Sequence, residues 1–487
     1  MSAHGAGAPG SLREQLARLE ARGLLHRVRA EVDPTWELAS IVRQVFRQHR
    51  PERRYALLFE RVRGHALPVV VGALAASRAV YATGLGVAPE AILERWATAL
   101  RCPLEPRLST GRLPDELVLQ GEAVDLTALP IPVWTPTRDA APYIAGPCCI
   151  TRDPETGVHN VAMRRMMLKD RRRLAFNVQS HPRTEVNAQH TAWEYAKYEA
   201  RNEPMPVAVV FGAEPVVGYV SAAKVPYAPA GRWSDYALAG GLAGRPLELI
   251  PCLTVPLYVP ASAEVVLEGV VAPHVREPEG PFGEFFGYMS RPGPRPVLEV
   301  RCIRLRREPL IQYVHSQRPP SESMVAQGIG NAGLLYKRLV YDLGFSEVVD
   351  VHIPEHTPLT HIIIQARRVS RAYAAQILHA AWTALASYSG KVLTLVDEDI
   401  DIRDPQQVEW AVHTRVQPHR DLTIVRPTRP LSLDPSVAPQ WSETAEASKL
   451  LVDATCKWEY PPPALPPAEL LARVRERWEG YGLPPLD

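Results

Sequence analysis

The sequence predicts a three-part protein in which an antiparallel β-barrel lies between an α/β domain and a compact α+β domain. A chain of 487 residues with 46% hydrophobic and 22% charged side chains is long enough for two or three domains with sizeable cores. Its 48 prolines are spread along the chain, which favours short strands and turns over a helical bundle. Strand-like segments are densest in the middle of the chain, where we place the barrel.

The N-terminal part of the chain alternates helical and strand-like patterns. Ser11 and Glu14 form a capping box that opens a helix. Asp33–Pro34 has the cap and the first-turn proline of a second helix. Further segments are expected as strands at 26–32, 55–62 and 68–74 and as a helix at 89–100. The order predicts an α/β module, and it contains no phosphate-loop signature.

Runs rich in Val, Ile and Tyr recur from about residue 125, separated by Gly and Pro. Such spacing predicts the strands of an antiparallel barrel. The expected strands cover residues 148–152, 158–168, 174–178, 207–212, 218–223, 263–272, 297–305 and 310–315. Two helices are expected among them, at 188–200 and 233–241.

The pattern changes again after Pro319–Pro320. Helices are expected at 332–343, at 371–385 and after Asp404–Pro405, and strands at 348–353, 361–367 and 392–396. This order predicts a compact α+β domain with helices on one side of a sheet. The tail combines proline-rich coil with an amphipathic helix at 467–478.

Charge, hydropathy and cysteine usage exclude several classes of protein. A net charge of +2 predicts no strong attraction to nucleic acid or to an anionic membrane. No apolar run approaches the ~20 residues that a membrane helix needs, and the N-terminus lacks a signal-peptide pattern. The six cysteines show neither CxxC nor zinc-site spacing, which indicates reduced, structural thiols. We therefore expect a cytoplasmic protein with no nucleic-acid or membrane partner.

The segment Glu277–Ser290 reads EPEGPFGEFFGYMS and carries the first candidate chemistry. Glu279 and Glu284 are separated by Gly-Pro-Phe-Gly, and such residues form an irregular turn that can aim both carboxylates into one cavity. Paired carboxylates suit acid–base catalysis, because like charges and burial push one pKa upwards. Taken alone, the segment also fits an ordinary acidic surface loop.

A second candidate is the strand segment Asn160-Val-Ala-Met-Arg164-Arg165. Alternation along a strand predicts Asn160, Ala162 and Arg164 on one face and Arg165 on the other, unless a bulge intervenes. An arginine can hold a carboxylate or a phosphate with its planar fork, although an exposed cation is the simpler interpretation.

His181, Asn160 and Asp235 could together complete a site for a hard cation, because carboxylate and amide oxygens suit Mg²⁺ or Mn²⁺ and imidazole suits Mn²⁺. A lone histidine is more often structural, and these residues are too far apart in the sequence for their spacing to decide. Lys391 precedes a buried strand and also fits a solvated strand start.

Several of these segments occur in the order typical of the UbiD family, which the chain resembles over most of its length. The resemblance rests on Glu-Gly-Pro-Phe-Gly-Glu at 279–284, Asn160 and Arg165 in their shared strand, Ser180-His181, and the segments 263–269, 397–401 and 448–455. Members of this family are reversible (de)carboxylases that use prenylated FMN.

The resemblance implies three domains with defined roles. Residues 1–122 would form the N-terminal α/β domain, and residues 123–318 a split β-barrel like that of flavin reductases, which binds prenylated FMN. Residues 319–487 would form a C-terminal α+β oligomerisation domain that ends in the helix and tail. The cofactor would lie between the second and third domains, and the protein would be a homodimer or a higher homo-oligomer, with a hexamer possible.

The resemblance also implies roles for individual residues. Glu279, Arg165 and Glu284 match the family's catalytic trio. The residues that match its cofactor site are Asn160, Ala162, Met163, Arg164, Arg165, Ser180, His181, Pro226 and Lys391.

The family's metal ligands map to Asn160, His181 and Asp235, which would bind Mn²⁺ or another divalent cation with K⁺ nearby. Asp235 stands where the family usually has Glu, so its carboxylate reaches one methylene less far. Phe285 and Phe286 match the substrate pocket, where aromatic walls favour flat conjugated acids.

The expected function is reversible, non-oxidative decarboxylation of an aromatic, heteroaromatic or α,β-unsaturated carboxylic acid, with release of CO₂. Prenylated FMN would be the electron sink, a flavin prenyltransferase would supply it, and Glu284 would protonate the product carbon. Two alternatives remain at this stage: a flavin-binding subunit of a multi-subunit carboxylase, or an FMN-dependent reductase.

Overall fold

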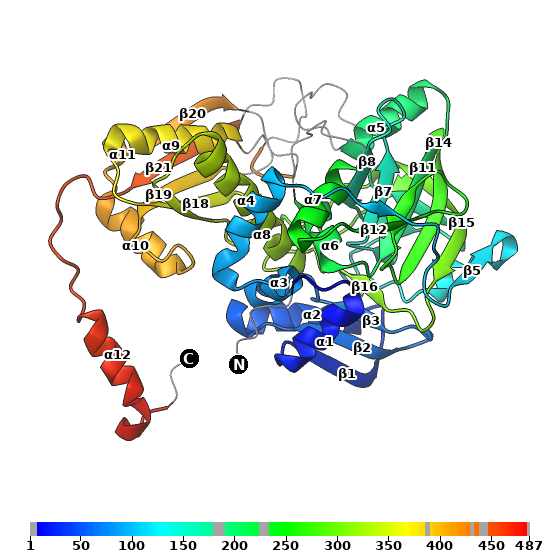
Figure 1. Cartoon of the computed structure of the whole chain (residues 1–487), viewed down its shortest axis with the longest axis horizontal. Helices are drawn as coiled ribbons and strands as arrows, with labels where there is room; N and C mark the ends of the chain where they lie inside the picture. Colours follow the sequence, from blue (N-terminus) through cyan, green and yellow to red (C-terminus); the bar gives the residue numbers. More distant parts are fainter. Residues whose placement is uncertain are drawn as a thin grey trace.

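Three lobes meet around helices α4 and α8 (Figure 1). The computed structural model describes residues 7–178, 190–223, 233–384, 390–428, 433–437 and 447–484. In Figure 1 the N-terminal lobe lies below the large β-sheet of the middle lobe, and the C-terminal lobe lies to the left. Helices α4 (Ile92–Arg101) and α8 (Glu322–Lys337) pack against each other between these lobes.

The N-terminal lobe has the predicted α/β pattern. Its elements are α1 (Leu12–Ala21), β1 (Leu25–Val32), α2 (Glu37–Gln48), β2 (Ala56–Val62), β3 (Val69–Val71), α3 (Arg78–Leu85) and α4. The predicted cap of α1 is confirmed, because Ser11 Oγ accepts a hydrogen bond of 3.2 Å from Glu14 N. Helix α2 begins at Glu37, three residues later than Pro34 predicts, and helix α3 was not predicted.

The middle lobe is built on one large, curled sheet with the strand order β6-β9-β10-β15-β14-β11-β7-β8, and with β5 paired to β15. Its strands are β5 (Leu117–Gln120), β6 (Tyr143–Ile144), β7 (Cys148–Arg152), β8 (His159–Met163), β9 (Met166–Leu168), β10 (Arg173–Phe176), β11 (Met205–Phe211), β14 (Val265–Glu279) and β15 (Gly293–Leu305). Helices α5 (His190–Ala200), α6 (Pro215–Ala222) and α7 (Ser234–Ala243) accompany it, and a small sheet joins β4 (Arg107–Leu108), β12 (Glu248–Pro251) and β13 (Tyr258–Pro260).

Two of the expected barrel strands were wrong. Residues 218–223 lie in α6 and directly after it, because Pro215 starts a helix whose residues are all buried. Periodicity cannot separate such a short apolar helix from a buried strand. Residues 310–315 do contain a strand, β16 (Ile311–Tyr313), but it pairs in parallel with β3 of the N-terminal sheet.

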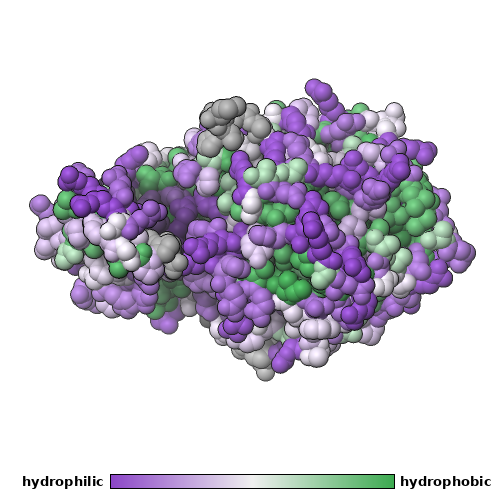
Figure 2. Space-filling model, turned by 90° about the horizontal axis from the view of Figure 1, so that it is seen from below, coloured by the Kyte–Doolittle hydropathy of each residue, from purple (hydrophilic) through white to green (hydrophobic). Residues whose placement is uncertain are grey.

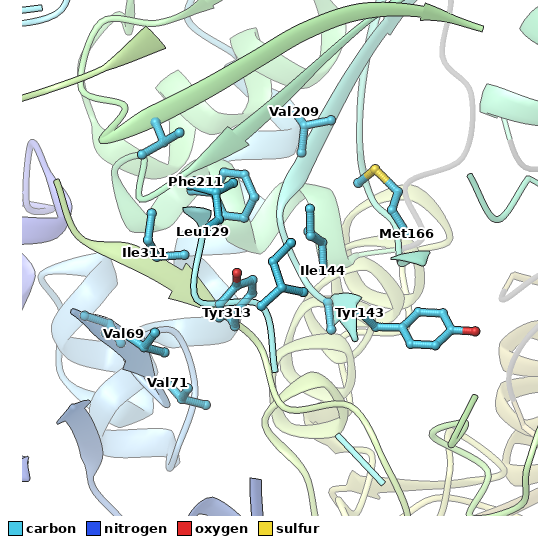
Figure 3. Close-up of a cluster of buried hydrophobic side chains, with 14 of the residues drawn as sticks. Val69, Val71, Leu129, Tyr143, Ile144, Met166, Val209, Phe211, Ile311 and Tyr313 are labelled. Atoms are coloured by element: carbon cyan, nitrogen blue, oxygen red, sulfur yellow. The ribbon is translucent and has the colours of Figure 1, made fainter. Parts of the chain in front are cut away.

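The crossing of β16 joins the cores of the first two lobes. Figure 3 shows Ile311 and Tyr313 between Val69 and Val71 of the N-terminal sheet and Phe211 of the large sheet. These side chains belong to one continuous buried cluster. The first two lobes therefore share a hydrophobic core.

The C-terminal lobe contains a five-stranded sheet with the order β17-β18-β19-β21-β20. Its elements are α8, β17 (Val348–His352), β18 (His361–Ala366), α9 (Arg371–Ala384), β19 (Val392–Asp397), α10 (Pro405–Arg415), α11 (Pro418–Asp421), β20 (Leu422–Thr428) and β21 (Ala447–Ala454). Helix α8 begins ten residues before the expected start at Ala332, because Gly328 and Gly330 weaken the helical pattern there.

The expectation of helices on one side of this sheet was wrong. Ile362 and Ile364 pack in the same cluster as α9, whereas Ile363 packs with Val408 and Ala411 of α10. Because successive side chains of a strand point to opposite faces, the two helices cover opposite faces of the sheet.

Helix α12 (Ala468–Glu476) stands apart from the three lobes (Figure 1). It has no buried residue, and its apolar residues Leu470, Leu471 and Val474 are exposed. Figure 2 shows a mainly hydrophilic face with hydrophobic patches between the polar side chains. Among the residues that the structure describes, no helix has the length and apolar character needed to cross a membrane.

Candidate active site

The connection between the two longest strands of the large sheet carries both candidate acids. Strand β14 ends at Glu279, which pairs in register with Gly293 at the start of β15. Gly280 has φ +89°, a conformation that favours glycine. Phe282 N and Ser290 N bond reciprocally to Ser290 Oγ and Phe282 O, at 3.0 and 2.7 Å. The connection is therefore an ordered hairpin, which we call the acid loop (residues 279–290).

Arg165 joins the two acids. It lies between β8 and β9, and its Nε and Nη2 donate to Glu279 Oε1 and Oε2 at 3.0 and 3.3 Å. Its Nη1 donates to Glu284 Oε1. The three side chains are buried, with exposed fractions of 9% for Arg165, 0% for Glu279 and 8% for Glu284. The guanidinium of Arg165 thus binds Glu279 in a bidentate manner and Glu284 through a single hydrogen bond.

The charges of this cluster support one another. Burial disfavours the charged form of Arg165, but the carboxylates of Glu284 and Glu279 outweigh it and raise the pKa of Arg165 above its usual value. Arg165 therefore stays a cation over the whole working range of pH. Its guanidinium carbon also lies 5.0 Å from the centre of the Phe282 ring, within range of a cation–π contact.

The acid cluster borders a cavity of about 140 Å³ between the middle and C-terminal lobes. Residues of the large sheet, of α6, of the acid loop and of α8 line it: Ala145, Gly146, Met163, Arg164, Arg165, Asn177, Ser221, Ala222, Phe282, Glu284, Phe285, Ser316, Ser323, Gln327 and Leu433. The prediction that Arg164 and Arg165 face opposite ways was wrong. Strand β8 ends at Met163, so alternation does not extend to the two arginines, and both line the cavity.

Only one of the two aromatic residues predicted for the pocket lines this cavity. Phe285 lines it, whereas Phe286 does not and instead packs on Phe285 with 5.2 Å between the ring centres. Phe282, which the sequence analysis missed, does line the cavity. Its position between the two acids of the motif was the signal that could have identified it.

The predicted cofactor residues differ in their relation to this cavity. Met163, Arg164 and Arg165 line it, and Ala162 precedes them on β8. Lys391 Nζ donates to Asp434 Oδ2 at 2.9 Å and to Ser436 Oγ at 2.5 Å, in the short segment whose Leu433 reaches the cavity. Ser180, His181 and Pro226 lie outside the described residues.

Asn160 and Asp235 come together at the next part of the sheet. Asp235 Oδ2 accepts a hydrogen bond of 2.7 Å from the backbone N–H of Val161, the residue after Asn160. Asn160 donates from Nδ2 to Thr151 Oγ1 at 3.1 Å and to Thr191 Oγ1 at 2.9 Å. This arrangement makes the carbonyl oxygen of Asn160 the ligand atom that it would offer a cation.

Helix α5 contacts Asn160 through Thr191, and it also contains His190 and Glu194, which the sequence analysis did not single out. His190 is the first residue of α5 and precedes Thr191, which contacts Asn160. Glu194 accepts from Thr151 Oγ1, and burial raises the pKa of Glu194 to about 8. Burial likewise raises the pKa of Asp235 to about 6. The described ranges contain no group of three or more His, Cys, Asp or Glu side chains in metal-binding arrangement.

An arginine that binds two buried glutamates beside a cavity between lobes is an arrangement that suits acid–base chemistry. Models of 3-octaprenyl-4-hydroxybenzoate carboxy-lyase match the chain almost end to end: the N-terminal domain at residues 16–100, the Rift-related domain at 108–319 and the C-terminal domain at 328–454. The chain belongs to the UbiD family and is a carboxy-lyase of that family.

Solved structures of UbiD-class enzymes resemble it along the whole chain. HmfF from Pelotomaculum thermopropionicum is 34% identical, and the match to its complex with FMN covers 95% of this chain and 99% of that one, with a TM-score of 0.82. An evolved dimeric form of HmfF in complex with prFMN matches with a TM-score of 0.80, over 95% of this chain and 98% of that one. Vanillic acid decarboxylase from Sedimentibacter hydroxybenzoicus is 26% identical over 97% of this chain and 100% of its own, with a TM-score of 0.81.

Proposed function

We propose that the protein is a reversible, non-oxidative decarboxylase of an aromatic, heteroaromatic or α,β-unsaturated carboxylic acid, with prenylated FMN as cofactor. The observation that carries this proposal is the bonding of Arg165 to both Glu279 and Glu284 at the wall of the cavity. Such a cluster supplies a cation for a carboxylate and an acid for proton transfer within one small space.

The residues around the cavity fit an anionic flavin. Arg164 would face its phosphate as a cation, and the hydroxyl groups of Ser221, Ser316 and Ser323 would bond to its polar edge. The wall formed by Met163 and the aromatic rings of the acid loop suits the flat ring system. When bound, prenylated FMN supplies an electron sink for the carbon that loses CO₂.

The acid cluster would handle the substrate carboxylate and the proton. Arg165 orients the substrate and holds both glutamates in position. Once the carboxylate has left as CO₂, the substrate carbon that carried it needs a proton. Glu284 donates this proton from its carboxyl group and later regains one from solvent. In the carboxylation direction Glu284 removes that proton, so one residue serves as acid and as base. Glu279, bonded twice to Arg165, keeps the guanidinium aligned.

The aromatic lining favours a flat, conjugated acid as substrate. Phe282 and Phe285 both line the cavity and would stack on such a ring or exclude water from it. The 26% identical decarboxylase from Sedimentibacter hydroxybenzoicus is named for vanillic acid, an aromatic acid. We therefore give aromatic acids the first place in a substrate panel.

Asn160 and Asp235 would hold Mn²⁺ or another divalent cation, with K⁺ nearby. Oxygen ligands, the half-buried Asp235 and the buried Glu194 suit such an ion, because its charge offsets carboxylates that burial otherwise disfavours. The imidazole would come from His181, which the resemblance to the family indicates, or from His190, which directly precedes the Asn160 partner Thr191 in the chain. Metal content of purified His181→Ala and His190→Ala proteins decides between them, since only the ligand's loss lowers bound Mn²⁺.

Homodimerisation through the C-terminal lobe, or a higher homo-oligomer, completes the proposal, with residues 319–487 as the oligomerising domain. The relative HmfF has an evolved dimeric form, and α12 carries exposed apolar side chains that a second copy would cover. All six cysteines are described and free, which supports a cytoplasmic location. Native mass measurement tests this point, and a monomer or a complex with foreign subunits would contradict it.

The central experiment is expression together with a flavin prenyltransferase, followed by denaturing mass spectrometry of the bound cofactor. We expect the mass of prenylated FMN, and release of CO₂ from at least one aromatic acid. Deuterium exchange into the product in D₂O should accompany it. Plain FMN with NAD(P)H oxidation and without CO₂ release would instead favour a reductase.

A further inference from the structure

We propose that Asp139 is a positioning residue that holds the acid loop against the middle lobe and thereby sets Glu284 at the cavity. This inference rests on the proposed role of Glu284 as proton donor. Asp139 lies in the segment before strand β6, far from the acid loop in sequence.

The two carboxylate oxygens of Asp139 bind two different parts of the chain. Oδ1 accepts a hydrogen bond of 3.0 Å from the backbone N–H of Gly283, the residue directly before Glu284. Oδ2 accepts one of 2.6 Å from the backbone N–H of Thr135. Asp139 therefore links the peptide next to the proposed proton donor to an ordered turn of the same lobe, since its own N–H donates to Thr135 O at 2.9 Å.

Close packing accompanies this link. A Cβ atom at position 283 would collide with Thr135 Oγ1, so only glycine allows the acid loop to approach the turn this closely. Burial raises the pKa of Asp139, whereas the N–H groups of Thr135 and Gly283 oppose that rise by binding the charged form. The hydrogen bonds to the N–H groups of Thr135 and Gly283 thus offset part of the cost of removing the Asp139 carboxylate from water.

Other bonds hold the start of the acid loop to the same segment. Ala140 N donates to Pro281 O at 3.0 Å, and Gly280 N donates to Tyr143 Oη at 3.1 Å. Both contacts lie nearer to Glu279 than to Glu284 along the chain. The bond from Asp139 is the one of these three that adjoins Glu284, so its loss should affect Glu284 more than Glu279.

The turn that anchors Asp139 is itself tied to the boundary of the C-terminal lobe. Gln317 Nε2 donates to Thr135 Oγ1, and His315 Nε2 lies 3.3 Å from Gln317 Oε1. Gln317 stands between β16 and α8, the helix that supplies Ser323 and Gln327 to the cavity. Hydrogen bonds therefore connect Gly283, through Asp139 and the turn at Thr135, to the junction between lobes that also forms the opposite wall of the cavity.

Asp139→Ala and Asp139→Asn test this role, with Asp404→Ala as a matched control that removes a carboxylate–backbone bond from the cap of α10. For Asp139→Ala we expect kcat to fall about 10- to 100-fold with KM changed less than about twofold, because a displaced proton donor affects the chemical step. Asn keeps one acceptor oxygen, so Asp139→Asn should recover part of kcat. The control should keep wild-type kcat.

Hydrogen–deuterium exchange of the intact holoenzyme gives a readout that needs no substrate. In Asp139→Ala the amides of residues 279–290 should exchange about tenfold faster or more, while peptides of the C-terminal lobe remain unchanged. Unchanged exchange in the acid loop, or kcat equal to wild type, would overturn the proposal, as would faster exchange throughout the chain. If the wild-type enzyme releases no CO₂ from any acid, the proposed function fails, and local exchange in the acid loop still decides whether Asp139 holds it.

Discussion

Two buried arginines of the middle lobe each bind two glutamates, but only the cluster of Arg165 lines the cavity between the middle and C-terminal lobes. Arg165 bonds to Glu279 and Glu284 beside the cavity. Arg304 donates from Nε to Glu116 Oε1 at 2.6 Å and from Nη1 to Glu268 Oε1 at 3.2 Å, and the exposed fraction of Arg304 and of Glu268 is 0%. The same residue types therefore serve two different purposes in one lobe.

Glu268 and Glu284 differ in the other groups around their carboxylates. Glu268 accepts from the backbone N–H groups of Leu253 and Thr254 and from Thr254 Oγ1, at 2.7 to 3.0 Å. These donors and Arg304 occupy the carboxylate of Glu268 and hold it in place inside the protein. Glu284 is bound by Arg165 and lines the cavity. If Glu284 is the proton donor, as we propose, access to the cavity rather than the pairing with arginine distinguishes it from the structural acid Glu268.

The largest expected effect separates the two clusters by activity. Glu284→Gln should reduce CO₂ release roughly 10²- to 10⁴-fold while prenylated FMN stays bound, because the amide cannot donate a proton as an acid does. Glu268→Gln should keep kcat and lose stability instead. Assays of both proteins on an aromatic acid check this, and a Glu284→Gln enzyme with wild-type turnover would remove Glu284 from the mechanism.

Removal of each arginine should separate the clusters by stability. Arg304→Met should lower the free energy of unfolding by about 3–5 kcal/mol, because it leaves Glu116 and Glu268 buried without their cation. Arg165→Ala should leave a folded, nearly inactive protein with a smaller loss of stability, since water that enters the cavity can solvate Glu284 and Arg295 Nε lies 4.0 Å from Glu279 Oε2. Denaturant unfolding of the two variants measures the difference. Equal losses of stability in the two variants would show that contact with the cavity does not lower the cost of removing the arginine.

A fall in pH should destabilise the protein through protonation of buried histidines, whereas the two arginines play no part in this effect. Burial, aided by the charge of Arg43, lowers the pKa of His315 to about 3, from an ordinary value near 6.5. Between these values the unfolded chain binds the proton that the folded chain does not, so stability falls as pH falls below about 6.5. The contribution is about 2 kcal/mol at pH 5.

Unfolding measured at pH 7 and at pH 5 checks this expectation. His315→Gln should show a smaller fall in stability than wild type between the two values, whereas His413→Gln, at an exposed position, should follow wild type. His352 and His361, whose pKa values burial lowers to about 3 and about 4, add to the same slope in all three proteins. An identical slope in all three proteins would contradict a neutral, buried His315.

The smallest effect concerns the Glu279 side of the active cluster. Tyr143→Phe removes the hydroxyl that accepts from Gly280 N and should cost about 1 kcal/mol of stability. We expect kcat to stay within about tenfold of wild type, because the bonds from Arg165 to Glu284 and from Gly283 to Asp139 remain. Thermal unfolding and the decarboxylation assay measure both quantities, and a loss of kcat as large as that of Glu284→Gln would assign Tyr143 a direct part in catalysis.

Local patterns in the chain predicted much of the fold and part of the site. The cap at Ser11, most strands of the large sheet and helix α9 follow from turn residues and apolar periodicity, which act over a few neighbours. The two acids of the acid loop were identified because glycine and proline flank them. The same reasoning failed for α6, for the partner of β16 and for the two faces of the C-terminal sheet, since these depend on what packs against each element.

By itself, the sequence determined the three-part order of the chain, the ordered turn at Glu279–Glu284 and membership of its family. Tertiary structure alone decided that Arg165 and Arg164 both face the cavity, that Phe282 replaces Phe286 in its lining, and that Asp139 reaches Gly283. The physical reason is that these contacts join segments far apart in the chain, and hydrogen bonds and burial between them leave no local periodicity. The difference between Glu284 and Glu268 is of the same kind, because cavity access and surrounding donors exist only once the lobes have packed.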